Sequence, residues 1–63
     1  MNIIEQNIEK LSELSKKNHN LYDLGRECRL FLNNDIYVNS KFPDDYSLAL
    51  EVKKTIKSTK ISK

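Results

Sequence analysis

The sequence predicts a small all-α protein, a helical hairpin followed by a third helix. Apolar residues recur at spacings of three and four along residues 3–17, 21–33 and 44–58, which is the period of an amphipathic helix. Residues that favour a helix start open each segment. The one stretch with strand propensity, residues 36–38, has no partner strand elsewhere in the chain. We expect this three-helix unit to be completed by self-association or by a partner protein.

The first helix is expected over residues 3–17. Its apolar positions share one face: Ile4, Ile8, Leu11 and Leu14. Asn2 can cap this helix, and Glu5 follows three residues later, as in a capping box. Asn7 and Ser15 fall on the apolar face. Polar side chains are tolerated there where water reaches that part of the face or where the asparagine finds a hydrogen-bond partner.

The second helix is expected over residues 21–33, after a connector formed by residues 18–20. Asn20 is its predicted cap, with Asp23 at the third position. Its apolar positions are Leu21, Leu24, Cys28, Phe31 and Leu32. A connector this short predicts an antiparallel hairpin with the first helix. Gly25 lies inside the helix, where glycine is unfavourable, and this predicts a close approach by a neighbouring backbone.

Residues 33–35 are expected to end the second helix, because asparagine tolerates the left-handed conformation found at many helix ends. We expect residues 36–42 to form an extended loop that lays Ile36, Val38 and Phe42 onto the helices. Loops often carry recognition residues, so this loop is also a candidate recognition element.

The third helix is expected over residues 44–58. The Pro-Asp-Asp sequence at 43–45 is a typical start, because acidic side chains favour the positive end of the helix dipole. Its apolar face consists of Leu48, Ala49, Val52 and Ile56. Tyr46 and Leu50 widen this face, which predicts two contact surfaces, one for the core and one for another chain.

The size of the chain predicts a single domain over residues 1–58 and a lysine-rich tail over residues 59–63. One cysteine and one histidine in 63 residues offer neither a disulfide nor a cluster of metal ligands, so association is the remaining route to a stable fold. We expect a cytoplasmic protein, because no secretory signal is visible and an unpaired cysteine suits a reducing compartment. Asn, Ile and Lys make up 22 residues, a bias usual for AT-rich coding DNA such as that of many phages.

The sequence predicts a protein without enzymatic activity, cofactor or bound metal. A single glycine cannot form a phosphate-binding loop, and no apolar run approaches the ~20 residues of a membrane span. His19 lies in a polar connector, and Cys28 lies on an apolar face where a thiol is a poor nucleophile. No residues are placed to act together as acid, base and oxyanion donor, so we expect no small-molecule substrate.

The leading hypothesis is a small regulator, adaptor or inhibitor, of a bacterial or phage type, that acts by protein–protein contact through an apolar helical face. Tyrosine and arginine are enriched among the residues that dominate interface energies. The candidate partner-binding residues are Tyr22, Arg26, Arg29, Tyr46 and Leu50. The expected partner is a larger protein or a second copy of the chain, which would give a dimer.

The alternative is a small nucleic-acid-binding regulator. Residues 1–52 have a charge balance of −3, whereas residues 53–63 contain five lysines and no acid. The candidate phosphate contacts are Lys53, Lys54, Lys57 and Lys60. The connector at residues 18–20 has the length of a helix-turn-helix turn, but Asp23, early in the second helix, would repel phosphate. A third alternative is an antitoxin-like module that combines both roles.

Overall fold

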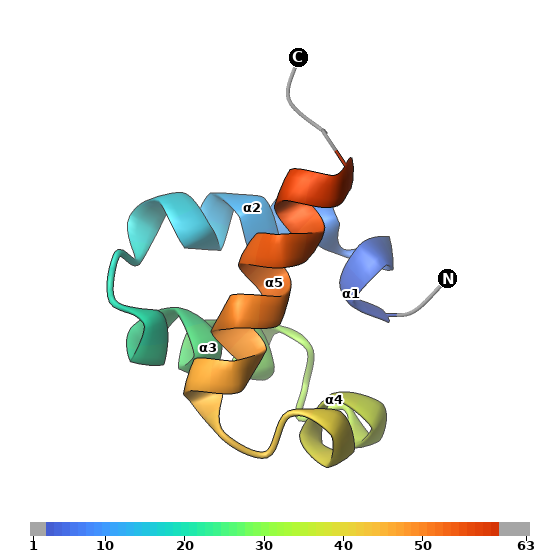
Figure 1. Cartoon of the computed structure of the whole chain (residues 1–63). Helices are drawn as coiled ribbons and strands as arrows, with labels where there is room; N and C mark the ends of the chain where they lie inside the picture. Colours follow the sequence, from blue (N-terminus) through green and yellow to red (C-terminus); the bar gives the residue numbers. More distant parts are fainter. Residues whose placement is uncertain (1–2, 60–63) are drawn as a thin grey trace.

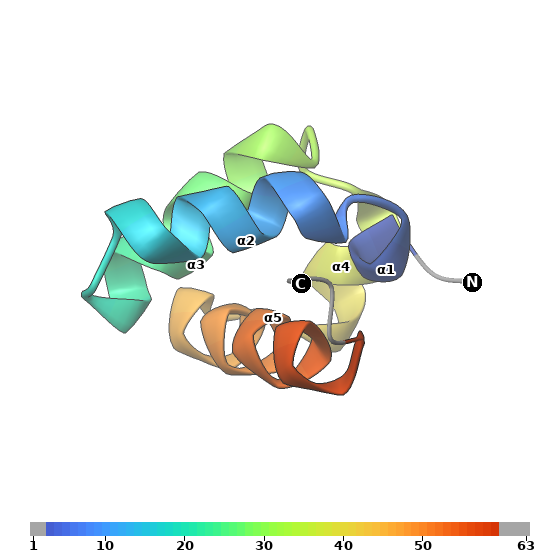
Figure 2. The ribbon, with the colours of Figure 1, turned by 90° about the horizontal axis from the view of Figure 1, so that it is seen from above.

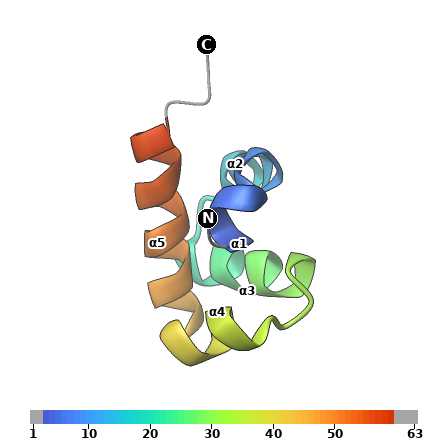
Figure 3. The ribbon, with the colours of Figure 1, turned by 90° about the vertical axis from the view of Figure 1, so that its right-hand side faces the viewer.

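The computed structural model describes residues 3–59 as five helices (Figure 1). In chain order they are α1 (Ile3–Gln6), α2 (Ile8–Lys17), α3 (Leu21–Phe31), α4 (Ile36–Lys41) and α5 (Asp45–Thr59). Helix α5 contacts α1, α2 and α3, and α4 lies beside the start of α5 (Figure 3). The all-α class is confirmed, and the described part of the chain holds more and shorter helices than the three expected.

The core lies between α5 and the layer formed by the helices that precede it (Figure 2). Its buried side chains are Ile4, Ile8, Leu11, Leu24, Cys28, Leu32, Val38, Leu48, Ala49 and Val52. All of them except Val38 belong to the apolar faces that the spacing predicts. The helical period therefore identifies which side of each long helix is buried.

The first predicted helix is interrupted at Asn7, so residues 3–17 do not form one continuous helix. The Asn7 side-chain amide donates to the carbonyl oxygen of Ile3 at 2.8 Å, and its backbone N–H is shared between the carbonyls of Ile3 and Ile4. Its φ and ψ of −114° and 22° depart from helical values. A side chain that bonds the preceding turn competes with the regular helical pattern. Helix α2 therefore starts anew at Ile8.

Asparagine residues define both ends of α3. Asn20 Oδ1 accepts hydrogen bonds from the backbone N–H groups of Tyr22 at 2.8 Å and Asp23 at 3.2 Å, which confirms the predicted cap. The helix ends two residues earlier than predicted. Asn33 and Asn34 follow with left-handed φ values of 58° and 53°, the conformation expected of asparagine at this position.

Helices α2 and α3 are joined by three residues, as predicted, and cross obliquely. Helix α2 is seen nearly end-on in Figure 3, whereas α3 runs across the same view. Helix α3 packs more extensively on α5 than on α2. The main partner of α3 is therefore the last helix of the chain.

The extended loop expected before the last helix is wrong, because Ile36–Lys41 forms helix α4. Asp35 Oδ1 accepts a hydrogen bond from the backbone N–H of Val38 at 3.2 Å and so caps this helix. Residues two apart point to the same side of an extended chain but to nearly opposite sides of a helix. Val38 is accordingly buried, whereas Ile36 is 85% exposed and does not lie on the core. Phe42 packs against the core as predicted.

Gly25 marks a close approach between α3 and α5, which confirms the expectation from its place inside a helix. A Cβ atom at this position would lie 2.6 Å from the carbonyl carbon of Asp45 and 2.8 Å from its Cα, and nearer still to its carbonyl oxygen. Non-bonded carbon atoms pack at about 3.5–4.0 Å, so any larger residue would push the two helices apart. Glycine therefore sets the spacing between α3 and the start of α5.

Helix α5 begins at the acidic residues that the sequence predicts, and Asp44 acts as its cap. Asp44 Oδ2 accepts a hydrogen bond from the backbone N–H of Ser47 at 3.0 Å, and the Ser47 hydroxyl donates to the same carboxylate. The bond from the Ser47 backbone is the main reason why the pKa of Asp44 lies below its ordinary value. The helix, Asp45–Thr59, is displaced by one residue from the predicted range.

Cys28 lies in the core, and burial, followed by the charge of Glu27, raises the pKa of its thiol from 9.0 to about 12. Because the thiolate forms more easily in the unfolded chain, this group has no effect on stability well below pH 9 and lowers it as the pH rises from 9 toward 12. We expect a Cys28→Ala variant to lose this part of the alkaline destabilisation. Urea unfolding from about pH 8 to about pH 11 measures the difference. Equal pH slopes in the two proteins would contradict the burial of the thiol.

Candidate functional site

The first turns of α3 and α5 bring two exposed tyrosines into contact. The ring centroids of Tyr22 and Tyr46 lie 5.3 Å apart, with their planes at 49°. Tyr22 is 62% exposed and Tyr46 is 40% exposed. Gly25 lies one turn after Tyr22 and permits this contact, because it lets α3 approach the first residue of α5.

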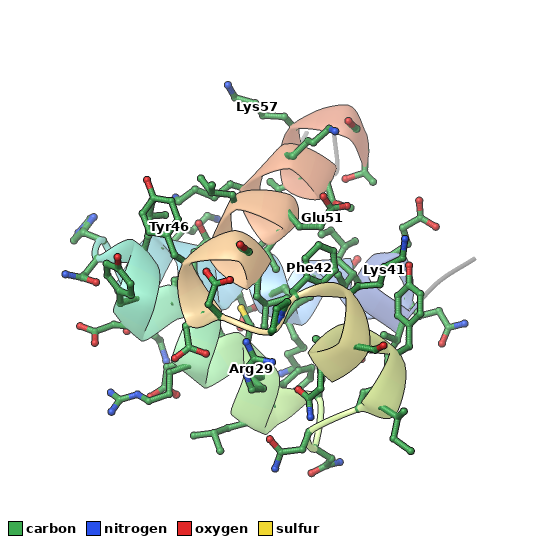
Figure 4. The ribbon with its side chains drawn as sticks, turned by 60° about the horizontal axis from the view of Figure 1, so that its bottom comes forward. Arg29, Lys41, Phe42, Tyr46, Glu51 and Lys57 are labelled. Carbon is green, nitrogen blue, oxygen red and sulfur yellow. The ribbon has the colours of Figure 1, made fainter. Side chains whose placement is uncertain are left out.

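Leu50 and Arg26 extend this tyrosine pair along the two helices. Leu50 follows Tyr46 by four residues on α5, and Arg26 follows Tyr22 by four residues on α3, so each pair shares one helix face. Figure 4 shows Tyr46 near the start of α5, at the opposite end of this helix from Lys57. We call Tyr22, Arg26, Tyr46 and Leu50 the aromatic surface. The fold thus groups four of the five candidate partner-binding residues.

Arg26 is available to a partner because its contact within the chain is loose. Its Nη2 atom lies 3.8 Å from Asp23 Oδ1, and both side chains are more than half exposed. Exposed ion pairs of this kind contribute little to stability. The guanidinium can therefore exchange Asp23 for a carboxylate or carbonyl group of another protein.

Arg29, the fifth candidate partner-binding residue, does not lie on the aromatic surface, because its side chain bonds to residues within the fold. Its side chain is only 15% exposed. Its Nε donates to Asp45 Oδ1 at 3.0 Å, and its Nη1 donates to Asn39 Oδ1 at 2.7 Å. Figure 4 shows it between α3 and the start of α5. Arg29 therefore connects α3, α4 and α5, and it supports the aromatic surface from within the fold.

Further exposed apolar residues were not singled out by sequence analysis. Leu30 follows Arg26 by four residues and is exposed, so it continues the outer face of α3 beyond the aromatic surface. The spacing of four residues from Tyr22 to Arg26 and from Arg26 to Leu30 could have shown in the sequence that Leu30 lies on this face. Phe31, predicted on the buried face, is more than one-third exposed. Tyr37 on α4 is 43% exposed and shares a helix face with Lys41, which lies across α5 from Tyr46 in Figure 4.

The candidate phosphate-binding lysines do not form one stripe. Lys53 is half-buried, and its Nζ donates to Ser15 Oγ of α2 at 3.0 Å. Lys54 and Lys57 are exposed, and Lys60 lies outside the described residues. Lys53 and Lys57 share one helix face because they are four residues apart, and Lys54 lies to one side of this face. Lys53 and Lys57 therefore offer their contacts on the same side of α5.

Helices α2 and α3 meet two geometric requirements of a helix-turn-helix, a three-residue connection and an oblique crossing (Figure 3). The charges on α3 are less suitable for binding DNA. Asp23 is exposed beside Tyr22, and Glu27 is half-exposed beside Arg26. Two acids near a single exposed arginine disfavour the phosphate backbone of DNA. The charge of this helix therefore argues against its insertion into a DNA groove.

The described residues show no site for metal chemistry. Within residues 3–59, no group of three or more His, Cys, Asp or Glu side chains could hold a metal ion. His19 is exposed on the connector, and the thiol of Cys28 is buried. None of the helices in this part of the chain is long and apolar enough to cross a membrane.

Comparisons with models of protein families, with curated proteins and with solved structures found no match to this chain. The aromatic surface and the lysine-bearing end of α5 are the two candidate binding surfaces of the described residues.

Proposed function

We propose that the protein is a small non-enzymatic regulator, adaptor or inhibitor that binds another protein through the aromatic surface. The observation that carries this proposal is the exposed contact between Tyr22 and Tyr46, which joins two helices distant in sequence. Aromatic side chains bury a large area, and tyrosine also offers a hydroxyl for hydrogen bonding. Two such side chains with a loosely paired, exposed arginine beside them match the composition of interface hot spots.

The rigidity of this surface favours binding. Gly25 brings the backbones of α3 and α5 together, and Arg29 links α3 to Asp45 at the start of α5. The helix backbones that carry the two tyrosines are therefore held next to each other before a partner arrives. A preorganised surface loses less conformational entropy on binding than a flexible one.

The partner that suits this surface is a larger protein with an apolar groove and an acidic or carbonyl rim, or a second copy of this chain. A groove would accept Tyr22, Tyr46 and Leu50, and the rim would accept hydrogen bonds from Arg26. Association would also stabilise a fold whose core is small. We place this activity in the cytoplasm, because the unpaired Cys28 suits a reducing compartment.

The proposal predicts which tyrosines matter for partner capture. Replacing Tyr22 and Tyr46 together by alanine should reduce co-purification of the partner by about tenfold or more, since hot-spot truncations commonly exceed 1.4 kcal/mol. The measurement is a quantitative pull-down from nuclease-treated lysate. Tyr37→Ala is the matched control, because Tyr37 has similar exposure and lies on α4.

The outcome distinguishes specific binding through the aromatic surface from non-specific binding. Capture of the same protein at the same yield by wild type and by the double variant would refute the proposal. A loss of capture in Tyr37→Ala alone would assign binding to α4 instead. Circular dichroism of each variant checks that the helices are intact.

The alternative proposal is a nucleic-acid-binding regulator that uses Lys53, Lys54 and Lys57. Its support is the concentration of lysine in the second half of α5. It predicts affinity that falls steeply with salt and that is lost when these three lysines become glutamate. We favour the aromatic surface, because the outer face of α3 carries two acids.

A further inference from the structure

A shallow pocket of about 190 Å³ lies between α2 and the second half of α5. Ser15, Lys53, Ile56 and Lys57 line it. Figure 4 shows Lys57 far along α5 from Tyr46, so the pocket is separate from the aromatic surface. An assignment of this pocket therefore goes beyond the proposed protein-binding function and does not depend on it.

The polar groups of the pocket are arranged as donors. Lys53 Nζ donates one hydrogen bond to Ser15 Oγ at 3.0 Å. Because Ser15 Oγ accepts this bond, its own hydroxyl proton is free to be donated, and the Lys53 ammonium keeps two further N–H groups. No carboxylate lines the pocket, and within residues 3–59 no ion pair is formed by Lys57. Two lysines and one serine therefore line this space, and no acidic side chain of residues 3–59 lines it.

We propose that this pocket binds a dianionic phosphate group, as inorganic phosphate or as a phosphate monoester. Lysine binds phosphate as a point charge, and a serine hydroxyl adds a directional hydrogen bond. The two ammonium groups match the charge of about −1.5 to −2 that a phosphate monoester carries at neutral pH. A phosphodiester carries a single charge and lacks this match. Among the described residues, Ile56 is the one apolar residue that lines the pocket.

The hydrogen bond between α2 and α5 distinguishes this pocket from two surface lysines without fixed positions. Lys53 is half-buried and fixed to α2 through Ser15, so one ammonium is held in place before the anion arrives. Lys57 lies one turn later on the same face and is exposed, so its flexible side chain can fold over the ion. Lys54 lies on a different face of the same helix and does not line the pocket.

The test is a titration of the ¹⁵N-labelled chain with inorganic phosphate, followed by amide chemical shifts, against sodium chloride of equal ionic strength. We expect saturable shifts centred on Ser15, Lys53, Ile56 and Lys57. Lys53→Met should weaken phosphate binding by about three- to tenfold, as expected for loss of one charge-assisted hydrogen bond. Lys54→Met, the matched control, should leave the affinity unchanged. Equal weakening by both variants, or shifts that follow chloride equally well, would overturn the proposal.

Ser15→Ala distinguishes the contribution of the Ser15 hydroxyl from the contribution of the lysine charges. It removes the free hydroxyl donor and the partner of Lys53 without changing the net charge, and it should weaken phosphate binding by about threefold or more. Unchanged affinity in Ser15→Ala would contradict the arrangement of donors proposed here. Thermal melts by circular dichroism verify that each variant is folded at the titration temperature.

Two further arms identify the source of the phosphate group. One arm compares a 5′-phosphorylated oligonucleotide with the same oligonucleotide carrying a 5′-hydroxyl. Larger amide chemical-shift changes of the pocket residues with the phosphorylated form would assign the site to a nucleic-acid end. Binding of phenyl phosphate but of neither oligonucleotide assigns it to a free phosphorylated small molecule. Equal binding of both oligonucleotides at the pocket would show that a phosphodiester suffices and would overturn the dianion assignment. The Tyr22→Ala, Tyr46→Ala double variant should bind phosphate normally, so failure of one proposal is distinguishable from failure of the other.

Discussion

Gly25→Ala is expected to destabilise the fold by about 2–4 kcal/mol, although alanine is the better helix former by about 1 kcal/mol. The added methyl group would overlap the backbone of Asp45, which cannot turn aside as a flexible side chain can. Helix α5 would have to move away from α3, and the side chains packed between them would lose contact. Because a domain of this size rarely has more than about 5 kcal/mol of stability, the variant should keep only about 1–3 kcal/mol.

A graded series at the same position provides the control. Alanine, serine and valine at position 25 should destabilise in increasing order of size, as measured by urea unfolding followed by circular dichroism. Gly25→Ala should also separate Tyr22 from Tyr46 and weaken partner capture. An alanine variant at least as stable as wild type would show that the helices do not approach this closely.

Arg29→Ala is expected to destabilise the fold by about 2 kcal/mol, because it removes hydrogen bonds that involve a charged group and the packing of a long side chain. Arg29 bonds Asp45 on α5 and Asn39 on α4, and its side chain is mostly buried. Two features of the structure limit this loss of stability. Asp45 is partly exposed, so water can solvate it after the change, and the Nη2 atom of Arg29 is buried without a hydrogen-bond partner in the described structure.

Arg26→Ala is the matched control for this prediction, because Arg26 is an exposed arginine on the same helix. It should change stability by no more than about 0.5 kcal/mol. Arg29→Lys should not restore stability, since an ammonium cannot reproduce the fork of donors that reaches both Asp45 and Asn39. Equal effects of Arg26→Ala and Arg29→Ala would contradict the internal role of Arg29.

The helices that are long and amphipathic could be predicted from the sequence, because their burial follows the helical period. The faces around Leu11, Leu24 and Val52 are buried as the spacing indicates. Helix α4 could not be predicted in this way, because six residues give too few turns for a period, and Ile36 and Val38 have the same apolar character. Asp35 caps this helix, and an aspartate directly before Ile36 was the sequence signal that could have indicated it.

The composition of the candidate site could be predicted, but its geometry could not. The sequence indicates that Tyr22 and Tyr46 lie on helix surfaces, and Gly25 indicates a close helix contact. Which helix approaches Gly25 depends on tertiary packing, so the contact between the two tyrosines was beyond sequence analysis. For the same reason Arg26 and Arg29, which look equivalent in the sequence, separate into an exposed and an internal residue.

The most direct test of the central proposal is photo-crosslinking with benzoylphenylalanine placed at position 22, at position 50 or at position 37 of the chain in living cells. The account predicts a crosslink to one protein, or to a second copy of the chain, from positions 22 and 50, which belong to the aromatic surface. Position 37, an equally apolar site on α4, should give none. Crosslinks of equal yield and identity from all three positions, or from position 37 alone, would contradict the assignment of the aromatic surface as the protein-binding site.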